Sequence, residues 1–164
     1  MNQQTFSDIE YSNRRRSTRR ESFLNEMDRL IPWDRWIAMI SPYYPEGRRG
    51  RPPKDKETML RMYLIRLWYD LSDEGTEDVI YDSYAMRRFM HLDFLDEQVP
   101  AATTLIRFRH LIDGKGIGDK IREEMRNLLA QSGKTLRTGS IQDARTVSLP
   151  AQAGSADNRK EELS

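Results

Sequence analysis

The segment KETMLRMYLIRLWYDLS, residues 56–72, restricts most strongly how this chain can fold. Its four leucines recur at helical spacing and predict one apolar face of an α-helix, which methionine, tyrosine and tryptophan side chains widen. These residues are Leu60, Leu64, Leu67 and Leu71, with Met59, Met62, Tyr63 and Trp68 beside them. A helix that is apolar over so much of its circumference must be enclosed by other elements. The segment is therefore predicted to be the buried centre of a domain.

Shorter amphipathic patterns on both sides predict the helices that enclose this centre. They run over residues 21–30, 33–40, about 76–90 with a break near Ser83, 103–112 and about 117–131. Pro32 should end the first of them and Gly133 the last, and Thr76 should cap the third. The expected fold class is mainly α, a small domain of five or six helices.

The two ends of the chain differ from this helical part in composition and in the spacing of apolar residues. Residues 1–20 are polar and predict a flexible basic arm, and residues 21–133 form the helical domain. Residues 134–164 have no helical period and predict a C-terminal stub with at most one strand and a disordered tail.

Composition excludes several classes of protein. The chain has no cysteine, so neither disulfides nor a cysteine-based zinc site can form, and His91 and His110 lack metal-ligand spacing. No stretch reaches the roughly 20 apolar residues of a membrane span, and the N-terminus lacks the apolar core of a signal peptide. The expected location is the cytoplasm, in association with the nucleoid.

Charge is unevenly distributed although the net charge is only +1. Basic residues outnumber acidic ones by 11 to 7 in residues 1–54 and by 8 to 4 in residues 101–137, whereas residues 55–100 carry 5 basic and 11 acidic residues. Two basic stretches flanking an acidic block suit a protein that binds duplex DNA through one face. A solvated, salt-bridged helical surface is the alternative.

The helices at about 76–90 and 103–112 form a helix-turn-helix-like region. Thr103, Arg107 and His110 share the face opposite Phe108, and Thr104 and Arg109 lie to its sides. Arginine can donate two bonds to a guanine edge, and threonine can contact a phosphate or a thymine methyl. An ordinary amphipathic helix with a polar outer face is the competing interpretation, because the connecting loop is longer than the 3–4 residues of the compact motif.

Two basic segments are candidate phosphate clamps, with solvated charge as the alternative. Their residues are Arg14, Arg15, Arg16, Arg19 and Arg20 in the first, and Arg48, Arg49, Arg51 and Lys54 in the second. Four aromatic residues near them, Trp33, Trp36, Tyr43 and Tyr44, could stack on exposed bases, but we expect them in the core.

Residues 5–147 resemble the N-terminal part of DDE-type bacterial transposases of the insertion-sequence-five (InsH-like) group. The motifs that carry the resemblance are RSTR, GRPP before ETMLR, WYDLSD, EDVIYDSYAMRRF and TTLIRFRHL, in this order. In that family a helical N-terminal domain recognises the terminal inverted repeats of the element. Ala101 stands where relatives often have aspartate before the two threonines, so Thr103 is expected to cap the helix instead.

The resemblance also implies a catalytic domain of the RNase-H-like fold, in which two aspartates and a glutamate hold two metal ions, Mg²⁺ in the complete family. Asp143, in GSIQDAR, matches the first aspartate, whereas Gln142 and Arg145 depart from the pattern. Asp157, Glu161 and Glu162 match nothing in it. We therefore expect a truncated transposase that binds DNA without autonomous catalysis and without a cofactor, with Asp143 a metal ligand only if the missing domain is supplied.

A second hypothesis is a helical protein-interaction module that associates with full-length transposase subunits or a second copy. The acidic block and the apolar stripe around Leu64 and Leu67 would form its interface. Salt distinguishes the two, because DNA binding through arginines weakens steeply as salt rises and an apolar interface hardly responds.

Overall fold

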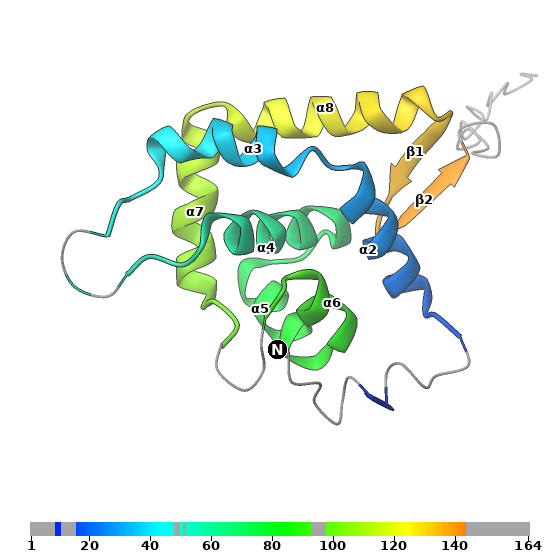
Figure 1. Cartoon of the computed structure of the whole chain (residues 1–164), viewed down its shortest axis with the longest axis horizontal. Coiled ribbons are helices and arrows are strands. Elements are labelled where there is room, and N and C mark those ends of the chain that lie inside the picture. Colours follow the sequence, from blue (N-terminus) through cyan, green and yellow to red (C-terminus); the bar gives the residue numbers. More distant parts are fainter. Residues whose placement is uncertain (1–8, 11–15, 48–49, 51, 93–97, 144–164) are drawn as a thin grey trace, which may run out of the picture.

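The computed structural model of the chain describes residues 9–10, 16–47, 50, 52–92 and 98–143. These residues are mainly helical, as predicted, with a small antiparallel sheet at the C-terminal side (Figure 1). The elements are α2 (Arg19–Leu30), α3 (Trp33–Ile40), the 3-10 helix η1 (Ser41–Tyr43), α4 (Lys56–Tyr69), α5 (Asp73–Asp82), α6 (Tyr84–Phe89), α7 (Ala102–Gly114), α8 (Ile117–Gln131), β1 (Lys134–Arg137) and β2 (Ser140–Asp143).

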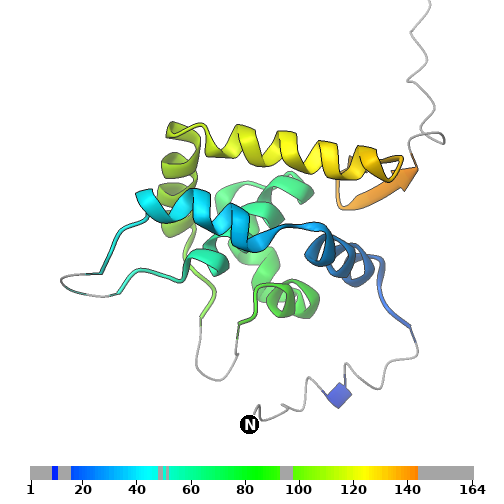
Figure 2. The same cartoon turned by 45° about the horizontal axis from the view of Figure 1, so that its top comes forward.

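Helix α4 runs through the centre of the domain, which confirms the main prediction from its sequence (Figures 1 and 2). Helices α3, α5 and α7 pack against it. Trp68 contacts the rings of Phe23 in α2 and Phe89 in α6, edge to face, at centroid distances of 5.5 and 5.6 Å. Each side chain buried this completely contributes about 1.5–3 kcal/mol to folding, so α4 supplies much of the core.

Helix α5 begins earlier than the sequence indicated, at Asp73 and not near Thr76. Ser72 caps it, because its Oγ accepts a hydrogen bond from the Gly75 amide at 2.9 Å. Thr76 is buried inside the first turn, and its hydroxyl donates to the Ser72 carbonyl at 2.7 Å. The prediction of Thr76 as the cap was wrong, since serine followed by two acidic residues starts a helix as well as it forms a turn. The predicted break at Ser83 is confirmed: Ser83 lies between α5 and α6 and caps α6.

The C-terminal side of the described chain contains two strands, which corrects the expectation of at most one. Strands β1 and β2 pair antiparallel, with Lys134 opposite Asp143 and Arg137 opposite Ser140. Gly139, at a φ of 63°, reverses the chain between them. Pairing gives backbone groups the partners that a lone strand would lack, which is the reason that a second strand forms here. The boundary expected at residue 134 stays a prediction, but the hairpin packs on α2 and α8.

The hairpin turn docks on the end of α4, and this contact predicts a cost for Gly139→Ala. The Gly139 amide donates to the Trp68 carbonyl at 2.8 Å, and a Cβ at position 139 would lie 2.6 Å from Cε1 of Tyr69. We expect a loss of about 2 kcal/mol in the free energy of unfolding, measured by urea denaturation.

Gly133→Ala is the matched control, because Gly133 also has a positive φ, 65°, but nothing lies within 4 Å of its added Cβ. Its free energy of unfolding should fall by only about 1 kcal/mol, the cost of a side chain on a left-handed backbone. Equal losses in the two variants would show that Tyr69 moves aside without cost.

Candidate functional site

Helix α7 is divided into a buried face and an exposed face as the sequence predicted. Leu105, Phe108 and Ile112 are buried in the core. Thr103, Arg107 and His110 are exposed on the opposite side, and Thr104 is half-buried between the two faces. Thr103, Arg107 and His110 therefore share one solvent-facing surface, with Thr104 at its edge, whereas Arg109 does not belong to it.

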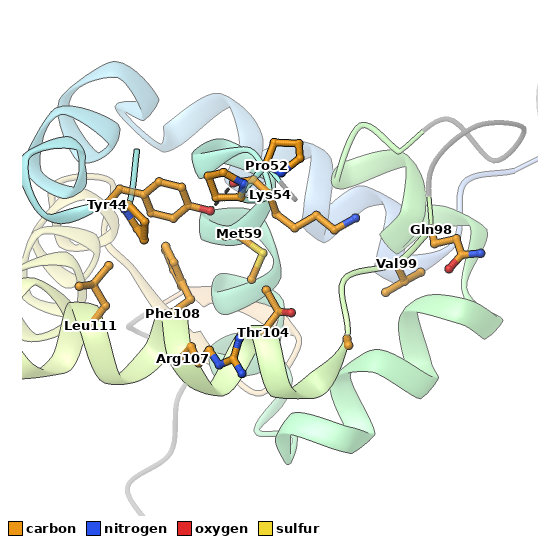
Figure 3. A pocket seen from close by; sticks show the side chains of 13 residues that line it. Tyr44, Pro52, Lys54, Met59, Gln98, Val99, Thr104, Arg107, Phe108 and Leu111 are labelled. Carbon is orange, nitrogen blue, oxygen red and sulfur yellow. Dashed lines mark hydrogen bonds between the residues drawn. The ribbon is translucent and has the colours of Figure 1, made fainter. Parts of the chain in front are cut away.

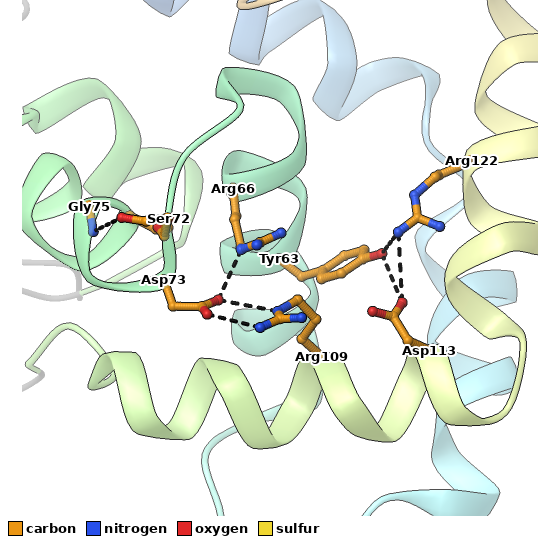
Figure 4. Close-up of polar contacts among 9 residues, drawn as sticks. Tyr63, Arg66, Ser72, Asp73, Gly75, Arg109, Asp113 and Arg122 are labelled. Carbon is orange, nitrogen blue, oxygen red and sulfur yellow. Dashed lines mark hydrogen bonds and ion pairs between the residues drawn. The ribbon is translucent and has the colours of Figure 1, made fainter.

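Arg109 is directed into the domain and not toward solvent (Figure 4). Its Nη2 lies 3.0 Å from Oδ2 of Asp73 and its Nε lies 3.3 Å from Oδ1. The same carboxylate forms an ion pair with Nε of Arg66 in α4 at 2.9 Å, without hydrogen-bond alignment. Asp73 is only 9% exposed. This network ties α4, α5 and α7 together and fixes which face of α7 looks outward.

The charges of this network are retained at neutral pH. Burial alone would raise the pKa of Asp73, but the hydrogen bond from Arg109 and the positive charges of Arg66 and Arg109 outweigh it, and the pKa lies below its ordinary value. The hydrogen bond to Asp73 raises the pKa of Arg109 in turn. Asp73 and Arg109 therefore form a permanent ion pair over the physiological pH range.

The N-terminus of α7 is capped from a neighbouring helix. Ala101 has no side chain that could accept a hydrogen bond, and the Ala102 amide donates to Oε2 of Glu77 in α5 at 2.9 Å. The expectation that Thr103 caps the helix is therefore wrong. A carboxylate is a favourable partner for the positive end of a helix dipole, so Glu77 both caps α7 and joins it to α5.

A hollow of about 500 Å³ lies between residues 44–45 and 52–54 on one side and the N-terminal half of α7 on the other (Figure 3). Met59 and Phe108 line its apolar interior, and Lys54, Thr104 and Arg107 line it as polar residues. The Tyr44 hydroxyl donates a hydrogen bond to the Lys54 carbonyl, which holds these two residues together beside α7. The fold thus brings Lys54, from one predicted phosphate clamp, to the same hollow as Arg107, from the predicted reading face.

The other basic candidates are placed elsewhere or lie outside the described residues. Five of these arginines lie outside the described residues: Arg14, Arg15, Arg48, Arg49 and Arg51. Arg16 is exposed before α2 and Arg19 is exposed in its first turn. The Arg20 guanidinium lies over the Tyr69 ring, 5.5 Å from its centroid. Figures 1 and 2 show α2 and α7 on opposite sides of α4, so these arginines are not beside the hollow.

Helix α5 gives the surface next to α7 an acidic character. Glu74, Asp78 and Asp82 are exposed on α5, which packs directly against α7. An anionic ligand is repelled on that side of α7 and attracted on the side of Lys54. The electrostatics therefore favour an approach to α7 from the hollow.

The aromatic residues are divided between core and surface. Trp36 is fully buried, and its indole N–H donates to Oε2 of Glu124 at 2.7 Å, so it is not available for stacking, as expected. Tyr44 is half-buried beside the hollow, and Tyr43 is 47% exposed with Lys115 over its ring. Leu64 is fully buried and Leu67 packs partly buried against the core, so the apolar stripe does not form an external interface.

Asp143 ends β2, and its side chain lies outside what the structure describes. Within the described residues, no group of three or more His, Cys, Asp or Glu side chains could hold a metal ion. The described helices also include none that is long and apolar enough to cross a membrane.

Sequence reasoning missed Asp73 and Glu77, the residues that position α7. Position 101 carried the available signal: an alanine at the N-cap of a well-formed helix implies that the cap comes from elsewhere in the fold.

Comparison with known protein families identifies the part of the chain that contains these features. Residues 12–111 match the family described as Transposase domain (DUF772), which covers α2 through most of α7. No solved structure matches the chain significantly. Because the match extends over more than half of the sequence, this chain belongs to the DUF772 transposase domain family.

Proposed function

We propose that this transposase domain binds double-stranded DNA at the ends of a mobile element, with α7 in the major groove as the second helix of a helix-turn-helix-like unit. The observation that carries the proposal is the exposed face of α7, where Thr103, Arg107 and His110 point to solvent beside Lys54. A recognition helix presents polar side chains of its N-terminal half to base edges in this way.

The residues divide into those that read bases and those that hold phosphates. Arg107 is suited to donate two hydrogen bonds to a guanine, with Thr103 and His110 as further contacts. Lys54, and at a distance Arg16 and Arg19, are suited to phosphates. We leave Arg109 out of the reading set, because its guanidinium is engaged by Asp73.

The acidic residues of α5 determine on which side of α7 the duplex lies. Glu74, Asp78 and Asp82 would repel a phosphate backbone on their side of α7, whereas Lys54 attracts it on the other. The DNA is therefore expected to follow α7 on the side of Lys54 and to avoid α5.

The test is binding to a pool of random duplexes, measured by fluorescence anisotropy at low and at physiological salt, followed by sequencing of the retained DNA. Enrichment of a defined sequence with steep salt dependence is the expected result. Salt-sensitive binding without enrichment would contradict sequence recognition by α7, and no binding would contradict the proposal as a whole.

Arg107→Ala is expected to weaken binding to the enriched duplex about tenfold and to relax the preference at one base pair, because one bidentate contact discriminates by about 1–3 kcal/mol. Binding to unrelated DNA should change much less. Arg126→Ala is the matched control, since Arg126 is an exposed arginine on α8, away from the hollow. If both variants reduced binding equally at every sequence, Arg107 would contribute charge and no base reading.

The proposed role of Asp143 rests only on the resemblance to DDE-type transposases. Its role as the first metal ligand of a catalytic site, with Mg²⁺ and a second chain supplying the other carboxylates, stays a prediction. Mg²⁺-dependent nicking that disappears in Asp143→Ala would support it.

A further inference from the structure

The hollow beside α7 has an apolar interior. A helix that only lies along a duplex would not need one. Its volume of about 500 Å³ falls within the roughly 300–1,000 Å³ of pockets that enclose small ligands. Met59 of α4, Phe108 of α7 and Val99 before α7 form its interior, and each is at most 6% exposed. A ligand that enters the hollow therefore meets apolar side chains on the inside.

Two aromatic rings form one wall of the hollow. The rings of Tyr44 and Phe108 are 6.3 Å apart between centroids and inclined at 66°. The hydrogen bond from the Tyr44 hydroxyl to the Lys54 carbonyl holds the Tyr44 ring in place. Burial raises the pKa of Tyr44, with a contribution from the Asp55 charge, so this hydroxyl remains a donor at neutral pH. A rigid aromatic wall suits a flat, partly apolar ring.

Polar and cationic groups surround this apolar interior. Figure 3 shows Lys54 extending from one side of the hollow and Thr104 and Arg107 rising from α7 on the other, with Gln98 near the end of the hollow. The cation of Lys54 at the opening suits a ligand that carries negative charge beside its ring. The amide of Gln98 and the hydroxyl of Thr104 can pair with the polar edge of a ring.

We propose that this hollow receives a nucleobase swung out of the bound duplex, next to the base pair that Arg107 reads, with a phosphate beside that nucleotide held by Lys54. A nucleobase within DNA combines the features that the hollow selects: a flat ring, a polar edge and flanking negative charge. The inference rests on the proposed function, since the base must belong to DNA that α7 already binds. Extrusion breaks one base pair and its stacking, and the aromatic wall replaces part of that stacking.

A mismatch scan tests this inference on the whole chain and the enriched duplex. Each base pair is mispaired in turn by changing only the opposite strand, so that the base that would enter the hollow is kept. At one position the mispair should tighten binding about tenfold, because the unpairing cost is already removed. An abasic nucleotide at that position should abolish the gain, since no ring is left to bind.

Two variants connect the effect to the hollow. Ala101→Trp and Leu111→Trp each place a large ring into it from a lining position, and both should remove the mismatch preference. Ala130→Trp is the matched control, because Ala130 is exposed on α8 and does not line the hollow; it should keep the preference.

The outcomes separate this inference from the proposed function. Tight binding to the fully paired duplex, with every mispair neutral or weakening, would overturn base extrusion and leave DNA recognition intact. A mismatch preference that survives in both filled variants would assign the effect to bending of the DNA and overturn the role of the hollow. Absence of binding to any duplex would overturn the proposed function itself.

Discussion

Arg61→Ala is expected to lower the free energy of unfolding by about 3–4 kcal/mol, the largest effect that we predict for a single substitution. Arg61 lies in the middle of α4 and is only 2% exposed. Its guanidinium lies over two rings, 3.9 Å from the Trp33 ring centroid and 4.9 Å from that of Phe89. Alanine would leave a cavity against these rings and remove the cation–π contacts.

The polar contacts of Arg61 add to this loss. Nη1 donates to the Phe89 carbonyl at 2.8 Å, a bond in the buried interior, and Nη2 lies 2.9 Å from Glu57. Nη1 also forms an ion pair with Asp28 at 2.9 Å. Glu57 and Asp28 keep access to water, so most of the cost comes from packing and from the unpaired carbonyl.

Arg61→Met and Arg61→Lys separate these contributions in urea denaturation. Methionine keeps the apolar stem and should recover about half of the loss, whereas lysine keeps the charge but cannot place three planar donors. The free energy of unfolding of Arg61→Lys should therefore remain about 2 kcal/mol below that of the wild type. Wild-type stability of Arg61→Lys would contradict a role for the planar guanidinium.

Asp73→Asn is expected to cost about 2 kcal/mol at neutral pH, because it leaves the largely buried guanidiniums of Arg66 and Arg109 without their anion. The pKa of Asp73 is lower in the folded chain than in the unfolded one. The stabilisation is therefore fully present above the unfolded value, about 4, and is lost as the pH falls through the folded value. Wild type and variant should converge in acid.

Urea denaturation between pH 7 and pH 2.5 measures this convergence. Asp119→Asn is the matched control, because Asp119 pairs with Arg122 on the surface and its side chain is 87% exposed. The control should change stability little at any pH. A constant difference between wild type and Asp73→Asn down to the lowest pH would show that Asp73 does not titrate as the ion pair requires.

The sequence predicted the helices whose ends and faces depend on nearby residues. The helix at Trp33–Ile40 and that at Ile117–Gln131 have the predicted bounds, because Pro32 and Gly133 mark their limits locally. The apolar run of α4 predicted its central position for the same reason. At the end of α8, Leu129 is buried and Leu128 is only partly buried.

Contacts between distant residues could not be predicted in this way. Arg61 is a charged residue in an apolar run, and its position against Phe89 depends on how α6 packs, 28 residues later. Arg109 looked like one more basic residue on a reading helix, whereas Asp73, 36 residues earlier, turns it inward. The hollow could not be predicted either, because it forms only when residues 44–45 and 52–54 lie beside α7.

The cap that Glu77 supplies to α7 has a consequence for how this domain can vary. A helix with its own aspartate at position 101 satisfies its first amides locally and leaves position 77 free to change. With Ala101, the same amide depends on a side chain 25 residues earlier in the sequence, so loss of Glu77 also loosens the start of α7. Positions 77 and 101 are thus expected to change together among related chains, linking the variability of α5 to the precision with which α7 is placed.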